Sequence, residues 1–168
     1  MGHVWMLRRF GIAATAPMFI PGLGAMIRLK QLLPTPREDA RVGLAGPMWG
    51  LAAAFACWVV ALTTHSPLFA ALTKVGAWVN LFNLLPIWQL DGSRAFRALT
   101  RTQRWLACAL ILAAFGATRE PLLLLILVVA VMRGFEKETS LEPDSRAFGE
   151  YAFLIAALSA LTLVPARV

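Results

Sequence analysis

Two residues far apart in this 168-residue chain carry side chains that could share a metal ion, His3 and Asp91. His3 follows Met-Gly, which would fill the two positions between the glutamate and the second histidine of a His-Glu-x-x-His helix. Such a helix sets two imidazoles one turn apart on one face, with the glutamate as general base. His3 therefore has the place of the second histidine. Because a single histidine near a terminus is more often merely solvated or packed, this interpretation needs a second half of the site.

The candidate second half is the stretch 83–92, Asn-Leu-Leu-Pro-Ile-Trp-Gln-Leu-Asp-Gly. Asp91 would supply a carboxylate, and its structural alternative is the N-cap of a helix over 93–99. Asn80 and Asn83 are three residues apart and share a helix face, where a buried amide needs a partner. We therefore expect Asn83 to point into the bundle, and an interhelical hydrogen bond is an equal alternative for Asn80. Pro86 ends this helix and frees backbone groups with which an extended substrate could pair.

Together these segments resemble the site-2 protease family of intramembrane zinc metalloproteases. Residues 2–12 are similar to the end of the family's active-site helix, and 83–92 to its Asn-x-x-Pro…Leu-Asp-Gly motif. Ala-Gly-Pro at 45–47 matches a family landmark between them. The resemblance covers residues 1–104 and, more loosely, the rest of the chain.

The resemblance implies an enzyme that binds Zn²⁺ and cleaves transmembrane segments of other membrane proteins. It implies His3 and Asp91 as metal ligands, and Asn83, Pro86 and Gly92 as residues that shape the active site and contact substrate. The family's first histidine and its catalytic glutamate would precede Met1, so no catalytic residue is assigned within this chain. We expect the polypeptide as written to be inactive or nearly so, because two ligands hold zinc poorly and loss of the base alone costs about 10²–10⁴-fold in rate.

Composition predicts an integral membrane protein. The chain is 59% hydrophobic and only 15% charged, which leaves too little polar surface for a soluble domain of this size. From residue 42 to residue 73 there is no Asp, Glu, Lys or Arg. That run is longer than the roughly 20 residues of one spanning helix, and two spans with a turn near His65 fit it better.

The net charge of +7 is explained by topology and not by nucleic-acid binding. Of the 16 basic residues, 13 precede the first span, follow the second, or lie in the last polar segment, and three (Lys74, Arg119 and Arg167) lie elsewhere. An excess of Lys and Arg on alternate connections marks the cytoplasmic side. We therefore expect a protein of the cell (inner) membrane, embedded in its lipid bilayer, with His3 and Asp91 both toward the cytoplasm.

The predicted architecture is an all-α, polytopic helical bundle forming one integral membrane domain over 1–168. Its parts are a remnant of the zinc-binding helix (1–14), a β-hairpin and surface segment (15–41), and membrane segments at 43–64, 68–86, 104–118, 121–133 and 151–165. The hairpin is expected around Pro-Gly-Leu-Gly at 21–24, because Pro and Gly there separate two apolar arms. The segments 104–118 and 121–133 are short, so they either span thinly or form a re-entrant pair.

Two other functions remain open at this point. A non-catalytic membrane protein could keep the fold and hold client helices, as a pseudoprotease; the other explanation for the missing residues is a false start at the methionine of a His-Glu-Met-Gly-His sequence. A small transporter with a helix broken at Pro86 would place Asn83 and Asp91 at mid-membrane depth, but it leaves the His3 segment unexplained. The sequence indicates neither the substrate nor the oligomeric state.

Overall fold

The computed structural model of the chain describes residues 3, 6, 18–20, 24–26, 35–87, 90–136 and 140–165. These ranges contain six helices and two short strands. In chain order they are β1 (Met18–Ile20), β2 (Gly24–Met26), α2 (Pro36–Thr64), α3 (Pro67–Asn83), α4 (Asp91–Ala98), α5 (Arg101–Thr118), α6 (Pro121–Gly134) and α7 (Ser145–Thr162). The described part of the chain is thus almost entirely helical, as the sequence predicts.

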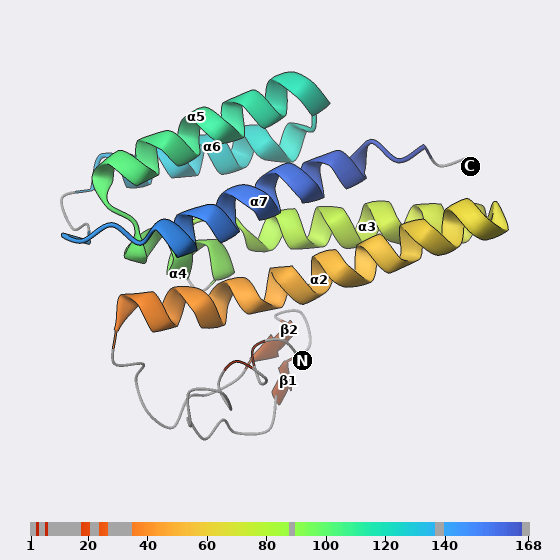
Figure 1. The fold of residues 1–168 in the computed structure, drawn as a ribbon, viewed down its shortest axis with the longest axis horizontal. Coiled ribbons are helices and arrows are strands. Elements are labelled where there is room, and N and C mark those ends of the chain that lie inside the picture. The colour runs from red at the N-terminus through yellow and green to blue at the C-terminus, as the bar shows by residue number, and fades with distance from the viewer. Residues whose placement is uncertain are drawn as a thin grey trace.

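The long helices form two hairpins that pack around α7 (Figure 1). α2 and α3 are joined by a turn in which His65 adopts φ 50°, and α5 and α6 by one in which Arg119 adopts φ 57°. α7 packs against α2, α3 and α5, and the short α4 packs against α2 and α7. His65 ends α2 and is a turn residue, the ordinary role that the sequence predicts for it.

Three helices begin earlier than the predicted membrane segments, because each starts with a polar, capped turn. The side chain of Thr35 caps α2 by accepting a hydrogen bond from the backbone amide of Glu38. The helix therefore includes residues 36–41, which belong to the predicted surface segment. Thr100 and Gln103 form a reciprocal capping box at the start of α5. Asp144 caps α7, which begins at 145, six residues before the predicted membrane segment 151–165.

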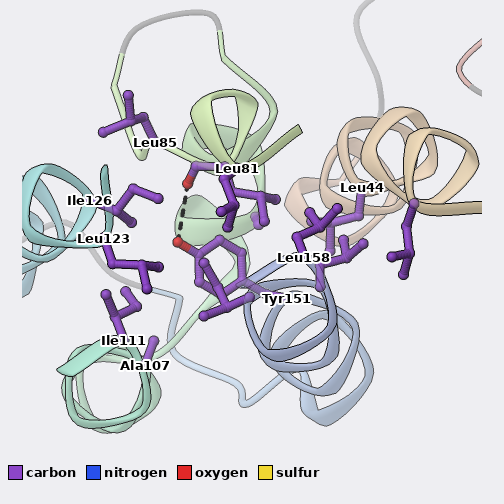
Figure 2. Packing of buried hydrophobic residues seen from close by; sticks show 14 of the residues in the cluster. Leu44, Leu81, Leu85, Ala107, Ile111, Leu123, Ile126, Tyr151 and Leu158 are labelled. Atoms are coloured by element: carbon purple, nitrogen blue, oxygen red, sulfur yellow. Dashed lines mark hydrogen bonds between the residues drawn. The ribbon is translucent and has the colours of Figure 1, made fainter. Parts of the chain in front are cut away.

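The core lies where α7 meets the two hairpins (Figure 2). Tyr151 of α7 is completely buried at its centre and packs edge-to-face on Phe96 of α4, with ring centroids 5.3 Å apart. Its hydroxyl donates a 3.1 Å hydrogen bond to the carbonyl oxygen of Leu84, just after the end of α3. This core therefore holds both ends of the connection between α3 and α4, which carries the predicted motif.

The outward faces of the long helices are apolar. Trp49, Leu68, Val75, Leu112, Val128 and Phe153, which come from five different helices, are each more than half exposed. Among the described residues, α2 is the one helix both long and apolar enough to cross a membrane. Only 33% of its most apolar stretch is buried inside the bundle. The other four predicted membrane segments are also helical, but their helices are too short or too polar to be identified as membrane spans by length and composition.

The N-terminal region is described only in part. β1 and β2 pair antiparallel, with Met18 opposite Met26 and Ile20 opposite Gly24, at the place where the sequence predicts a hairpin. The expected turn and the remainder of the second arm lie outside the described residues. Of the predicted helix remnant over 1–14, the structure describes His3 and Met6, and both have helical backbone.

Candidate metal centre

His3 and Asp91 lie side by side in the structure. The Nε2 atom of His3 is 3.6 Å from Oδ2 of Asp91, and the two side chains are 30% and 15% exposed. The other ring nitrogen of His3, Nδ1, is 2.7 Å from the carbonyl oxygen of Val42 in α2. If Nδ1 carries the proton and donates it to this carbonyl, Nε2 keeps its lone pair for a metal, the arrangement that orients metal-binding histidines.

Gly46 of α2 makes room for this pair. A Cβ atom at Gly46 would overlap the imidazole of His3 and lie 3.2 Å from Oδ2 of Asp91. In the sequence, Gly46 belongs to the family landmark Ala-Gly-Pro at 45–47, and its four-residue spacing from Gly50 and Ala54 indicates close helix packing. The structure shows that Gly46 faces the candidate site.

Asp91 is fixed by a tight connection. It is the first residue of α4, and Leu90, not Asp91, occupies the N-cap position, so the alternative role of Asp91 as a cap is absent. Gly92 lies so close to the Leu84 carbonyl that any Cβ there would overlap it. On the next turn Arg94 forms a 3.2 Å ion pair with Asp39, which ties α4 to the first turn of α2.

Burial of the Asp91 carboxylate disfavours its charged form. Burial raises the pKa of its carboxyl from 3.8 to about 6, although His3 and Arg94 nearby favour the charged form. A bound cation would oppose the burial effect and keep the carboxylate ionised.

The separation and the chemistry of the two donor atoms are both compatible with zinc. Two ligands of a tetrahedral zinc stand about 3.4 Å apart, given metal–ligand distances of about 2.0–2.2 Å, and the observed separation of 3.6 Å needs little adjustment. A neutral imidazole and a carboxylate are both ordinary zinc donors. Among the residues that the structure describes, no group of three His, Cys, Asp or Glu side chains gathers to complete a site.

The chain is similar to a zinc metalloprotease. The relative is the zinc metalloprotease MJ0392 of Methanocaldococcus jannaschii, which is 24% identical over 161 residues. The alignment covers 83% of this chain but 45% of the relative, so the chain spans less than half of the protein that it matches. No family model matches the chain.

The other predicted site residues have mixed positions. Asn83 is the last residue of α3 and is half-buried, next to the connection that leads to Asp91. Pro86 was expected to free backbone groups for a substrate, and its own carbonyl accepts a 2.8 Å hydrogen bond from Nε of Arg133. Asn80 donates to the Gly76 carbonyl of its own helix at 2.7 Å, and this bond is not the interhelical one considered for it.

Sequence reasoning missed residues that position the site without touching it. Tyr151 is the chain's one tyrosine and lies in an apolar stretch, which is a usable signal, because a buried hydroxyl requires a partner. Arg133 is one of many basic residues at helix ends, and the sequence predicts for it only a location on the cytoplasmic side. Its bond to Pro86 joins parts of the chain far apart in sequence and could not be deduced from spacing.

Proposed function

We propose that this chain carries two of the three protein ligands of a catalytic zinc, His3 and Asp91, in an intramembrane protease of the site-2 type. The observation that carries the proposal is the 3.6 Å approach of His3 Nε2 to Asp91 Oδ2 in the space left by Gly46. The similarity to a zinc metalloprotease supports the same conclusion.

The placement in a membrane is supported by the surface of the bundle. Soluble monomers rarely expose large continuous apolar areas, whereas here every long helix presents exposed Leu, Val, Phe or Trp side chains. Lipid would cover these faces. In this proposal the ends of the helices that carry most of the arginines, together with the metal centre, face the cytoplasm.

The chain's own residues hold and orient the site. The carbonyl of Val42 orients the ring of His3, and Gly46 lets this ring approach α2. The Asp39–Arg94 ion pair ties the helix that begins with Asp91 to the start of α2. Zinc, when bound, lowers the pKa of a water molecule to about 7 and so makes it a nucleophile for the scissile carbonyl. The third ligand and the general base would be a histidine and a glutamate encoded directly before Met1 of this sequence.

The test compares an extended protein with its matched control. The extension adds the residues encoded upstream, and its Glu→Gln variant keeps the histidine ligand but lacks the base. We expect both to bind about one zinc ion per chain, and cleavage of a model transmembrane substrate to fall by about 10²–10⁴-fold in the Glu→Gln variant. Equal cleavage by both proteins would refute the protease proposal, as would upstream DNA that encodes no His-Glu.

A non-catalytic binding protein is the second candidate, favoured by one observation. The described residues bring together two metal donors and no third. If the extended protein bound zinc or a client helix without cleaving it, the fold would serve binding alone.

A further inference from the structure

The α5–α6 hairpin is shorter than the hydrocarbon core of a typical bilayer. The helix α6 has 14 residues, and the uncharged part of α5, residues 105–118, is equally long. At a rise of about 1.5 Å per residue, each stretch covers about 21 Å. The uncharged stretch 42–64 of α2 covers about 34 Å by the same measure. Because the hydrocarbon core is about 30 Å thick, α2 matches it, whereas the hairpin is about 10 Å too short.

Three hydrogen bonds fix one end of the hairpin beside α4. Arg104 donates from Nε to the Phe96 carbonyl at 3.1 Å and from Nη1 to the Arg133 carbonyl at 2.9 Å. Arg133 donates from Nε to the Pro86 carbonyl at 2.8 Å. The start of α5 and the end of α6 therefore lie level with α4 and the α3–α4 connection. The missing length must then appear at the opposite end, and Figure 1 shows the α5–α6 turn well short of the α2–α3 turn.

An aromatic pair lies at the α4 end of the hairpin. Trp105 of α5 and Phe135, which follows α6, pack edge-to-face with ring centroids 5.1 Å apart, and both side chains are exposed. Tryptophan gathers at the boundary between lipid headgroups and acyl chains. In a membrane, this pair therefore marks where the hydrocarbon begins on the α4 side of the hairpin.

Two charged residues, Arg119 and Glu120, form the turn at the opposite end of the hairpin. The Arg119 guanidinium lies 5.9 Å from the centre of the Phe115 ring, one helical turn back along α5, so this side chain does not extend beyond the turn. The Glu120 carboxylate accepts a 3.4 Å hydrogen bond from the Leu122 amide and caps α6. Charged groups are costly inside hydrocarbon. Water should therefore reach the level of the turn itself.

We propose that the outward face of the α5–α6 hairpin fits a locally thinned bilayer, whose hydrocarbon part is about 20 Å thick there. The aromatic pair and the charged turn mark its two boundaries, and exposed apolar side chains such as Leu112 and Val128 lie between them. Lipid around a short apolar segment adapts by becoming thinner, so acyl chains that are short suit this face best. The proposal rests on the membrane placement proposed above and is independent of the metal centre.

The experiment measures the depth of nitroxide labels on the whole chain in vesicles of dioleoylphosphatidylcholine. The two native cysteines are replaced first. Ala117→Cys then labels the last turn of α5, Leu62→Cys the last turn of α2, and Thr102→Cys the first turn of α5; all three positions are exposed. Depth follows from the relaxation of the label by oxygen, which enters lipid, compared with that by a water-soluble nickel chelate.

We expect the labels at Ala117 and Leu62 to lie at the same depth within about 4 Å, near the headgroups, because the lipid thins to meet the hairpin. The label at Thr102 should lie among the headgroups of the other leaflet. Without thinning, the Ala117 label would lie about 10 Å deeper than the Leu62 label. If the hairpin were instead displaced as a whole, the Thr102 label would enter the hydrocarbon.

A neutral variant tests whether the charges cause the thinning. Arg119→Gln combined with Glu120→Gln removes both charges and keeps an oxygen that can cap α6. In vesicles of dierucoylphosphatidylcholine, whose acyl chains are longer, we expect this variant to place the Ala117 label about 5 Å or more deeper than in the unsubstituted hairpin. Arg101→Gln, which removes an exposed charge at the α4 end, is the control and should leave the Ala117 label in place.

Three results would overturn the proposal. They are an Ala117 label about 10 Å deeper than the Leu62 label, a Thr102 label inside the hydrocarbon, and an Ala117 label shielded from both reagents by a second copy of the chain. If the neutral variant does not fold, the comparison of the three labels decides. Labels that are all in water without lipid contact would refute the membrane placement itself, and this proposal with it. None of these readouts depends on zinc or on proteolysis.

Discussion

At the scale of single residues, Gly46 is the position where one added methyl group would test the metal centre. A Cβ there would overlap the His3 ring, so Gly46→Ala should push the imidazole away from Asp91. We expect zinc affinity of the extended protein to fall by about 10–100-fold, the usual effect of disturbing a ligand's support. Gly116→Ala is the matched control, because nothing lies within 4 Å of a Cβ at that helical position. The control should leave zinc affinity unchanged and raise stability by about 0.5–1 kcal/mol. Unchanged zinc binding in Gly46→Ala would show that His3 does not lie against this glycine.

How much of the site could be predicted also differs from residue to residue. The approach of His3 to Asp91 was predictable because both residues lie in recognisable motifs, although their role as zinc ligands stays a prediction. The contact of Gly46 with His3 was not predictable, since neither the family landmark at 45–47 nor the four-residue spacing of small residues indicates what Gly46 faces. An interhelical hydrogen bond was one alternative for Asn80, whereas in the structure its side chain lies against Gly50 and its amide donates to a carbonyl within α3.

At the scale of elements, the hydroxyl of Tyr151 joins α7 to the α3–α4 connection through the Leu84 carbonyl. Tyr151→Phe keeps the ring on Phe96 but leaves that carbonyl without this donor, which should cost about 1–3 kcal/mol of stability. Because the same carbonyl lies against Gly92, we also expect weaker zinc binding by the extended protein. Thermal unfolding in detergent and zinc titration measure the two effects. Ser159→Ala is the control on the same helix, since its hydroxyl bonds only to a carbonyl one turn earlier in α7 and should matter little. Equal effects of both substitutions would remove the special role of Tyr151.

The elements themselves were largely predictable, and their starting points were not. Apolar runs located α2, α3, α5, α6 and α7, because the outward-facing and the core-facing residues of these helices are both largely apolar. In α2, α5 and α7 the apolar run begins after the first helical turn, which is polar and capped. The Thr-x-x-Glu sequence at 35–38 and the Thr-x-x-Gln sequence at 100–103 are capping signals that would have corrected two of these boundaries.

At the scale of the whole molecule, the ends of the helices form two groups, and one group carries most of the basic residues of the helices. The first turns of α2, α5 and α7, the last turn of α6 and all of α4 lie at one end of the bundle, and the α2–α3 and α5–α6 turns lie toward the other (Figure 1). The arginines of α4 and of the first turn of α5 belong to the first end. The charge count predicted this arrangement, because alternate connections of a helical hairpin necessarily return to the same side.

This separation predicts the orientation in the membrane. A cysteine introduced at Ser66, in the α2–α3 turn, should react with a membrane-impermeant thiol reagent added outside intact cells. One introduced at position 101 should react only after the membrane is permeabilised, because the proposed orientation keeps the arginine-rich end in the cytoplasm. Both native cysteines, of which Cys108 is buried and Cys57 partly buried, are first replaced by serine or alanine so that the label reports one site. Labelling of both positions from the same side would contradict the bundle's passage through the bilayer. Labelling from outside of the cysteine at position 101 alone would instead indicate the opposite orientation, with the His3–Asp91 pair on the outer face.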